Sequence, residues 1–166
     1  GPIAESAHLI FWFSMDYYHD TKSRLEAMGW KVNPFPLIWH KSDNTGILPD
    51  PQRGPRRIYE TPFIASRGDR LVVRAKSNAF AHPGKDKSIH TSEKPVTMLR
   101  YFMEMFVDEY SSVLDPTCGS GNALKAASQL GARTTLGIER DPIFYANAVA
   151  AYFETTEPVL EEPFNV

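Results

Sequence analysis

The sequence predicts an α/β domain with a mostly parallel sheet, and three observations predict it. The run His8–Phe13 is apolar on both faces and too short for a typical helix, as expected of a buried strand. Residues 112–153 alternate two short apolar runs with two helical patterns, which favours parallel strands joined by right-handed crossovers. A glycine-containing loop, Asp115–Asn122, lies between the first of these strands and its helix. The 166 residues have the length of one domain, so we expect 1–166 to form a single unit.

A helix and a bent strand are expected after the first strand. Residues 16–28 carry apolar side chains among charges, and Gly29 is a typical helix stop. Residues 30–32 and 36–40 predict a second strand, interrupted by two prolines that belong near a sheet edge.

The middle of the chain is predicted to be rich in loops. Residues 58–66 and 71–73 suggest two strands joined by a turn at 67–69. Residues 42–57 and 76–91 have no apolar period and many turn residues, so they are predicted to be long loops. We therefore expect 41–91 to form a loop-rich, basic insert.

The C-terminal part has the clearest periodicity. Apolar side chains recur every three or four residues from Val96 to Val107, after a proline suited to the first helical position, and predict a helix facing the core. A strand at 112–115, a helix at about 122–130, a strand at 134–139 and a helix at 142–153 follow. The acidic, proline-containing tail 155–166 is expected to be a loose end.

Charge and cysteine content limit the classes of function. Residues 41–94 hold 11 basic and 6 acidic side chains, a net charge of +5, whereas residues 101–166 hold 3 and 10, a net charge of −7. The basic region is a candidate for binding a polyanion, although a solvated loop facing the protein's own acidic surface explains the charge equally well. The single cysteine, Cys118, suits a reducing compartment. With no signal peptide and no apolar run that could span a bilayer, we expect a soluble, cytoplasmic protein without a membrane partner.

The loop at 115–122 has the pattern of a nucleotide-type binding turn. Gly119 and Gly121 permit a sharp turn and close approach of a ligand, and the following helix start offers unpaired amides. Eighteen residues after Gly121, Glu139 ends the next strand, where an acid usually holds two ribose hydroxyls. Leu124 stands where a dinucleotide fingerprint has its third glycine, which disfavours a nicotinamide or flavin cofactor. A purely structural turn remains the alternative for the loop taken alone, and no metal site is predicted.

A second segment carries a family resemblance. His90-Thr91-Ser92-Glu93-Lys94-Pro95, followed by an amphipathic helix and then Asp115-Pro116-x-x-Gly119-Ser120-Gly121, closely resembles the S-adenosylmethionine site of beta-group DNA amino-methyltransferases. Taken singly, Ser92–Pro95 fits a helix start without a ligand. The upstream strand, helix and Tyr59-Glu60-x-x-Phe63 are similar to later parts of the same fold, so the resemblance covers nearly the whole chain.

The resemblance implies a Rossmann-like, three-layer methyltransferase fold, S-adenosylmethionine as cofactor and DNA as partner, as in restriction-modification systems. It implies site-specific methylation of adenine N6 or cytosine N4, without distinguishing the two. Carried over residue by residue, the cofactor-binding set is Thr91, Ser92, Lys94, Asp115, Pro116, Thr117, Gly119, Ser120, Gly121, Asn122, Glu139 and Arg140. Many members have phenylalanine at the position of Thr117 and threonine at that of Asn122, so side-chain contacts there are open.

The basic region lies where the family places its target-recognition insert. Candidates for phosphate contact are Arg53, Arg56, Arg57, Arg67, Arg70 and Arg74, and Trp39 and Tyr59 are candidates for stacking on a base. The alternative for each is a core aromatic or a solvated arginine.

The family's catalytic element, an Asp, Asn or Ser followed by Pro-Pro and an aromatic residue, does not occur in these 166 residues, so no catalytic residue is assigned. The nearest matches, Asn33–Pro36 and Asp50–Arg53, lack the adjacent prolines or the strand context. In the beta group this element precedes the strand resembling His8–Phe13, and Gly1-Pro2 is typical of a removed purification tag. We therefore expect an incomplete sheet, without its central strand, that is closed by rearrangement, self-association or a separate polypeptide.

Two other functions are consistent with the same residues. One is a methyltransferase-like module that has lost catalysis and serves as a cofactor sensor or DNA-binding partner. The other is methylation of RNA on the same fold.

Overall fold

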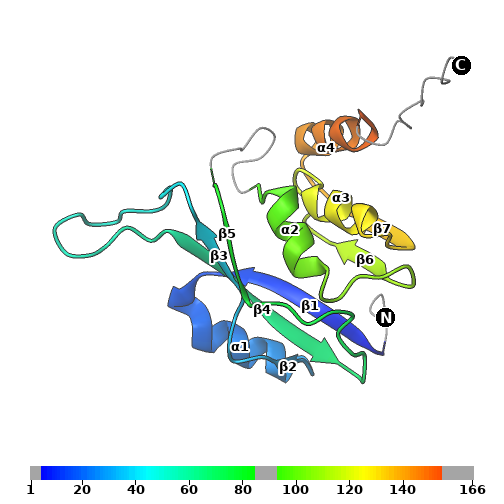
Figure 1. Cartoon of the computed structure of the whole chain (residues 1–166), viewed down its shortest axis with the longest axis horizontal. Coiled ribbons are helices and arrows are strands. Elements are labelled where there is room, and N and C mark those ends of the chain that lie inside the picture. Colours follow the sequence, from blue (N-terminus) through cyan, green and yellow to red (C-terminus); the bar gives the residue numbers. More distant parts are fainter. Residues whose placement is uncertain (1–4, 85–92, 155–166) are drawn as a thin grey trace, which may run out of the picture.

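The computed structural model describes residues 5–84 and 93–154 (Figure 1). The elements in chain order are β1 (Ala7–Phe13), a 3-10 turn (Met15–Tyr17), α1 (Tyr18–Ala27), β2 (Lys31–Val32), β3 (Ile38–Lys41), β4 (Tyr59–Arg67), β5 (Ala79–His82), α2 (Val96–Met103), β6 (Ser112–Asp115), α3 (Asn122–Gln129), β7 (Thr134–Gly137) and α4 (Pro142–Glu154). The expected segments at 16–28, 112–115, 122–130 and 142–153 therefore match observed elements to within a few residues.

Five strands form the larger sheet, in the order β1-β4-β3-β5 with β2 also paired to β4. β4 is antiparallel to β1, β2 and β3, whereas β3 and β5 are parallel. β4 is buried on both faces from Thr61 to Phe63 because one face packs in the cluster that includes α1 and the other against the cluster that includes α2. The expected single strand interrupted by prolines is two separate strands: β2, which pairs with β4, and β3, which lies inside the sheet between β4 and β5.

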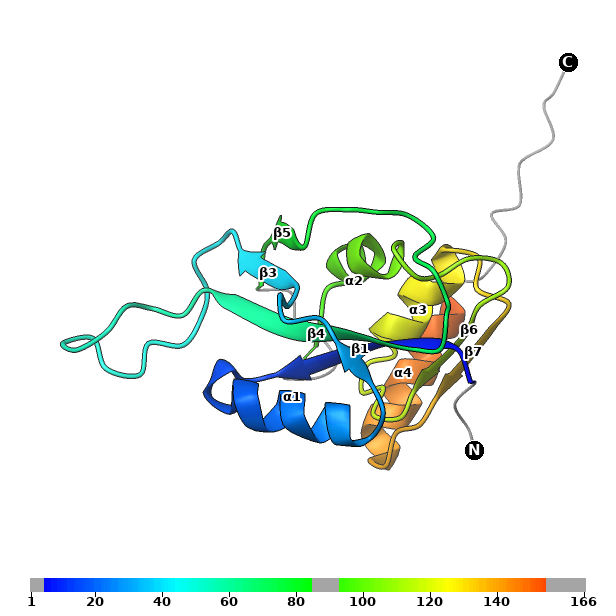
Figure 2. The same ribbon diagram turned by 90° about the horizontal axis from the view of Figure 1, so that it is seen from below.

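Helices cover both faces of this sheet, which makes three layers (Figure 2). Leu9 and Phe13 of β1 pack in a cluster with Leu25 of α1, whereas Ile10 and Trp12 of the same strand pack against α2. The alternation follows from the two-residue period of a strand. The α/β domain in three layers that was expected from the sequence is therefore observed.

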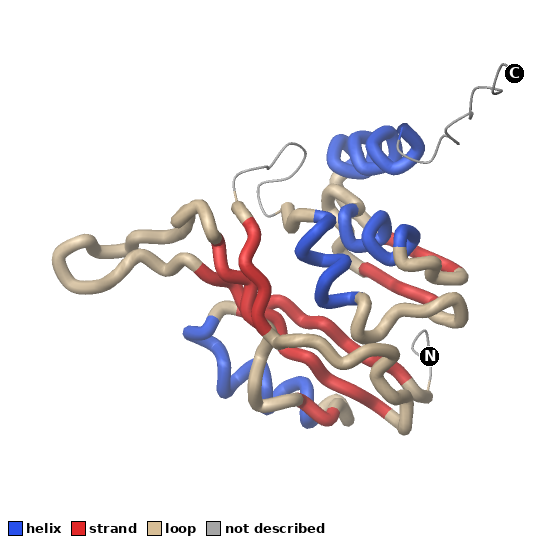
Figure 3. Tube along the Cα trace, viewed as in Figure 1, coloured by secondary structure: helices blue, strands red, loops and turns tan. Residues whose placement is uncertain are grey.

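A separate two-stranded sheet carries the C-terminal half. β6 and β7 are parallel, and Leu114 lies beside Leu136 in their register. α3 covers one face of this pair, while Leu114, Leu136 and Ile138 on the other are 40%, 57% and 53% exposed. Within the described residues, β6 pairs with β7 and not with β1, so the sheet is interrupted at the place expected (Figure 3).

α2 joins the two sheets. Its buried Met98, Leu99 and Phe102 belong to one core cluster that also includes Trp39 of β3 and Ala126 of α3. Ile10 of β1 and Val113 of β6 pack against the same cluster. The expectation that the apolar side of this helix is core is confirmed.

Three further expectations need correction. The sheet is not mostly parallel, because β4 runs against three neighbours, and a loop without a crossover helix joins β3 to β4 and reverses the chain. Residues 76–91 are not a loop throughout, since β5 lies within them, whereas the strand expected at 58–66 forms as β4 and residues 42–57 are a loop as expected. No strand forms at residues 71–73: Leu71 is exposed, and the backbone N–H of Val73 donates to the carbonyl of Met105 beyond α2.

In the part of the chain that the structure describes, none of the helices has the length and apolar character needed to cross a membrane.

Candidate functional site

The loop after β6 makes a compact turn in front of α3. Gly119 and Gly121 have φ angles of 51° and 75°, a region that residues with a side chain rarely adopt. The turn is closed by the N–H of Gly121 donating to the carbonyl of Cys118, and the N–H of Cys118 donates to the carbonyl of Ile138 after β7. Because Gly121 is the N-cap of α3, the first amides of that helix point toward the turn.

Glu139 lies at the centre of this site. Its Oε2 accepts a hydrogen bond of 2.9 Å from the N–H of Gly119, and its Oε1 accepts one of 2.9 Å from the N–H of Asp141. Glu139, two residues beyond the end of β7, is therefore joined to the glycine loop that follows β6, as parallel neighbours with adjacent carboxyl ends predict. A carboxylate has roughly four acceptor positions, so it can bond hydroxyls of a ligand while keeping these two donors.

A second carboxylate makes the site electronegative. Asp115 accepts a hydrogen bond of 3.0 Å from the N–H of Thr117. Burial raises the pKa of Asp115, and the nearby charge of Glu139 adds to the rise against the opposing hydrogen bond from Thr117. Burial, Asp115 and Glu139 likewise raise the pKa of the Cys118 thiol, which keeps it protonated. Two neighbouring carboxylates suit a ligand that presents hydroxyl or cationic groups.

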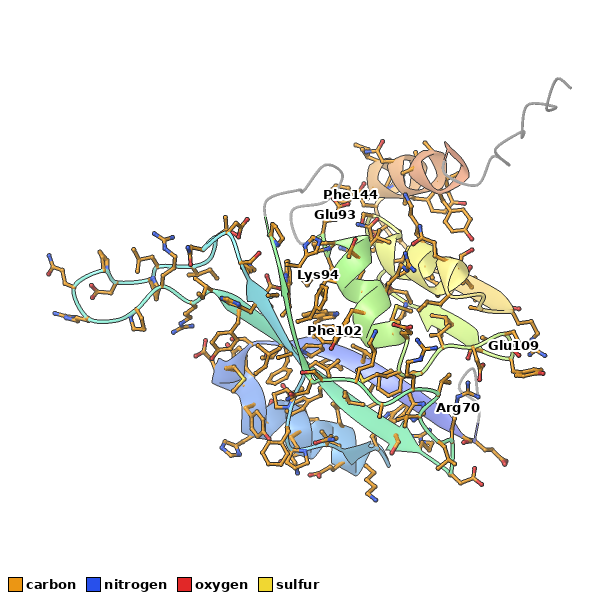
Figure 4. All side chains as sticks on the ribbon, in the orientation of Figure 1. Arg70, Glu93, Lys94, Phe102, Glu109 and Phe144 are labelled. Atoms are coloured by element: carbon orange, nitrogen blue, oxygen red, sulfur yellow. The ribbon has the colours of Figure 1, made fainter. Side chains whose placement is uncertain are left out.

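Asn122 joins the two segments that the sequence picked out separately. Its Nδ2 donates to Oε1 of Glu93 at 2.8 Å and to the carbonyl of Lys94 at 2.9 Å. Glu93 is buried, and Lys94 lies at the N-terminal end of α2 on the side of the larger sheet (Figure 4). The structure therefore brings the start of α2 and the start of α3 together at one site. The individual role of Glu93 was missed, although its segment was singled out.

Leu124 and Gly137 explain the departure from the dinucleotide pattern. A side chain at Gly137 would collide with Cδ1 of Leu124 and Sγ of Cys118. α3 can therefore approach β7 closely because Gly137 on the strand has no side chain, and not because the helix carries a third glycine.

The remaining cofactor candidates lie at the edge of the site. Pro116, Thr117 and Arg140 are exposed, whereas Gly119, Ser120 and Gly121 are buried. Thr91 and Ser92 lie outside the described residues. Asp141 caps α4 by accepting hydrogen bonds from the N–H groups of Ile143 and Phe144.

Residues 42–58 form an arm that projects away from the rest of the molecule in Figures 1 and 2. A bridge between Ile47 and Arg57 closes its base. Arg53, Arg56 and Arg57 are exposed on the arm, and Tyr59, at the start of β4, is half exposed. Arg57 pairs with Asp16 at 3.4 Å near the start of the 3-10 turn.

Other nucleic-acid candidates are placed differently. Trp39 is completely buried and its Nε1–H donates to the carbonyl of His82, so its ring is core and not available for stacking on a base. Arg67 stacks on the ring of Trp30 and donates to the carbonyl of Met28. It lies at the opposite end of β4 from the arm, about 30 Å away for a nine-residue strand.

Arg70 and Arg74, also considered for phosphate contact, hold residues 69–78 against the end of α2. Arg70 pairs with Asp108 at 3.1 Å, and Arg74 pairs with Glu104. Among residues 5–84 and 93–154, no group of three or more His, Cys, Asp or Glu side chains is placed to hold a metal ion.

Comparison with known proteins points in the same direction as the geometry. A family model described as DNA methylase matches residues 3–150. The type II methyltransferase M.HindIII of Haemophilus influenzae is 35% identical over 65 residues, which are 39% of this chain and 21% of that protein. The chain thus matches about a fifth of the length of this curated relative.

Solved structures share the fold. M1.HpyAVI in its complex with SAM superposes with a TM-score of 0.75 at 19% identity, covering 89% of this chain and 75% of that one. PvuII DNA methyltransferase, which is cytosine-N4-specific, superposes with a TM-score of 0.69 at 13% identity, covering 95% of this chain and 65% of that one. At these identities the likeness establishes a common fold.

Proposed function

Because the chain belongs to the DNA methylase family, we propose that it is the S-adenosylmethionine-binding portion of a site-specific DNA methyltransferase. In this proposal the parent enzyme methylates the exocyclic amine of adenine (N6) or cytosine (N4), within the cytoplasm. The observation that carries it is the convergence of the glycine loop, Glu139 and the 93–94 segment at one site.

The proposed cofactor contacts divide between the two ends of the ligand. The glycine loop from Asp115 to Asn122, together with Thr91, Ser92 and Lys94, binds the methionine part, and Glu139 bonds the ribose hydroxyls. Arg140, which follows Glu139 in sequence, is proposed as a further contact. The two positive-φ glycines and the α3 amides fit a ligand that approaches the backbone closely and carries a carboxylate. When bound, S-adenosylmethionine supplies an electrophilic methyl group on its sulfonium.

A calorimetric titration tests this assignment. The chain is expected to bind S-adenosylmethionine and its demethylated product, and to give no heat with a nicotinamide dinucleotide, because Leu124 and Gly137 replace the dinucleotide pattern. Equal binding of the dinucleotide, or no heat with either form of the methyl donor, contradicts the assignment.

Transfer itself is proposed only for the whole protein, since these 166 residues contain no Asp/Asn/Ser-Pro-Pro-aromatic element. A cofactor-sensing or DNA-binding module on the same fold is the second candidate. Assaying the parent protein with labelled cofactor against DNA and RNA distinguishes these functions. Labelled DNA supports the enzyme, labelled RNA alone supports the RNA methyltransferase, and no label on either supports the module.

The arm at 42–58 is proposed to contact DNA. Arg53, Arg56 and Arg57 are exposed together on it, and Tyr59 at its base presents half of its ring to solvent. Arginines that neutralise phosphates release counterions, so each contact contributes about −0.9 to the slope of log affinity against log salt concentration.

Replacing Arg53, Arg56 and Arg57 with glutamine is expected to reduce this slope by two to three, on the order of one per phosphate contact. The measurement is anisotropy of a labelled DNA duplex across a salt series. Arg67→Gln is the matched control, because Arg67 lies at the far end of β4, and it is expected to leave the slope unchanged. If the triple variant keeps the original slope, or if Arg67→Gln lowers it by one, the arm is not the interface.

We further propose that another polypeptide strand completes the interrupted sheet. β1 and β6 are edge strands of separate sheets, yet both pack against α2. Edge strands and exposed apolar faces promote association with other chains. Without another segment, the chain is expected to pair with a second copy of itself.

A further inference from the structure

One partly buried carboxylate, that of Glu60, lies between the arm and the candidate cofactor segment. Oε1 of Glu60 pairs with Nζ of Lys41 at 2.6 Å, and Oε2 pairs with Nζ of Lys94 at 2.8 Å. The side chains of Lys41 and Lys94 are 11% and 19% exposed. Both oxygens of the same acid are therefore bonded to ammonium groups that are largely shielded from water.

The two lysines come from different parts of the fold. Lys41 ends β3 where the arm begins, and its backbone N–H donates to the carbonyl of Ile58 at the other end of the arm. Lys94 precedes α2 and belongs to the segment that Asn122 joins to the glycine loop. Glu60 is consequently a direct connection between the base of the arm and the cofactor segment.

The two lysines that pair with Glu60 also lie near tryptophan rings and line a cavity. The ammonium of Lys41 lies 5.1 Å from the centre of the Trp39 ring, and that of Lys94 lies 5.0 Å from the centre of the Trp12 ring. A cavity of about 520 Å³ adjoins the cluster and is lined by Lys41, Thr45, Gly46, Ile47, Glu60, Gly84 and Lys94. Thr45, Gly46 and Ile47 belong to the arm, so the arm and the two lysines line the same cavity.

Hydrogen bonds join residues at the base of the arm beside this cavity. Asp43 accepts hydrogen bonds from Thr45 and from the N–H of Gly84, and these bonds, the side-chain bond of Thr45 above all, lower the pKa of Asp43 to about 2. Burial alone raises the pKa of Glu60, but the hydrogen bonds from Lys41 and Lys94 outweigh it and hold this pKa below its usual value. Glu60 therefore stays ionised, with one negative charge shared by two positive charges.

We propose that Glu60 is a positioning residue that couples cofactor binding at Lys94 to DNA binding by the arm. This inference rests on the proposed function, and it adds that the two sites communicate. An anionic group of the cofactor at Lys94 competes with Glu60 for that ammonium. The carboxylate of Glu60 then pairs more fully with Lys41, which holds the base of the arm in one arrangement.

Coupling of this kind is reciprocal. If the cofactor and DNA both favour the same arrangement of the cluster, each of them increases the affinity for the other. We expect the demethylated product of the cofactor to tighten DNA binding by about five- to tenfold, the low end of typical coupling. The ratio of DNA affinities with and without this ligand is the quantity to measure.

The test compares this ratio among variants of the whole chain, using a labelled duplex at one salt concentration. Glu60→Gln removes the charge with little change of shape and is expected to bring the ratio close to one. Lys41→Met keeps the side-chain stem against Trp39 and leaves the Glu60–Lys94 pair intact, and it is also expected to bring the ratio close to one. This second variant keeps the proposal falsifiable if Glu60→Gln fails to fold.

Glu104→Gln is the matched control. Glu104 also pairs with two basic side chains, Lys76 and Arg74, but these lie outside the cavity. Glu104→Gln changes the net charge as Glu60→Gln does, so a general gain in DNA affinity from the lost negative charge is common to both variants. The ratio of DNA affinities with and without the demethylated product is expected to be the same for Glu104→Gln as for the unaltered chain.

The proposal is overturned if Glu60→Gln or Lys41→Met folds and keeps the original ratio, or if the unaltered chain binds both ligands with a ratio of one. Those results leave the proposed function standing. Failure of the chain to bind the cofactor at all is a failure of the proposed function, and the separate titration detects it.

Discussion

Glu139→Ala is expected to weaken binding of S-adenosylmethionine by at least about a hundredfold. Hydrogen bonds to a charged group contribute about 1.5–3 kcal/mol each, and two ribose hydroxyls bonded to one carboxylate therefore account for about 3 kcal/mol or more. The substitution also removes the acceptor for the N–H groups of Gly119 and Asp141, so the glycine loop loses its side-chain connection to the segment after β7 and keeps the backbone bond from Cys118 to Ile138. Isothermal calorimetry measures the loss.

Two further variants separate the role of Glu139 from a general effect of charge. Glu139→Gln keeps one carbonyl oxygen as acceptor and is expected to retain part of the affinity, with a loss on the order of tenfold. Glu109→Ala removes a carboxylate from an exposed position beyond α2, remote from the labelled Glu93 and Lys94 (Figure 4), and is expected to bind like the unaltered chain. Binding by Glu139→Ala within threefold of the original affinity would show that the acid does not hold the ribose.

The position of Glu139 illustrates which parts of the site follow from sequence. An apolar run, a glycine turn and a helical pattern, followed by a second apolar run ending in an acid, define adjacent parallel strands whose carboxyl ends meet. The meeting of Glu139 with Gly119 could therefore be predicted from local patterns. The bond from Asn122 to Glu93 could not, because no local rule specifies a contact between side chains 29 residues apart.

The middle of the chain shows the opposite case. Leu71-Val72-Val73 has the branched residues of a strand, but its exposed side chains have no sheet neighbour, and the backbone bonds to Met105 instead. Ala79–His82 has weak strand propensity and precedes Pro83-Gly84, yet it forms β5 because β3 offers a parallel edge. Propensity does not reveal which edge is available.

Trp39 and Glu60 were hard to interpret for a related reason. In sequence Trp39 is an aromatic residue near a basic loop, and only the packing of α2 against β3 shows that its ring is core. Glu60 is one acid in a basic region, and its partners are 19 and 34 residues away in sequence. Ionic contacts between distant segments depend on tertiary structure, which a charge count does not contain.

The interrupted sheet gives the other large expected effect, a change in oligomeric state. The chain alone is expected to run above its monomer mass, as a dimer or larger species at micromolar concentration, when measured by light scattering after size exclusion. Leu114→Lys is expected to return it to a monomer, because Leu114 lies beside Leu136 on the exposed face of β6 and β7, and a lysine there opposes burial by a partner.

Leu71→Lys is the matched control for this variant. Leu71 is 83% exposed, but it lies on residues 69–78 and not on either sheet, so the same substitution there is expected to leave the association unchanged. If both substitutions disrupt the association, the disruption comes from general charge repulsion, and the exposed face of β6 and β7 is not the contact surface. If the unaltered chain is monomeric at every concentration up to its solubility limit, the edges of β1 and β6 are stable without a partner, and the proposal of an added strand is wrong.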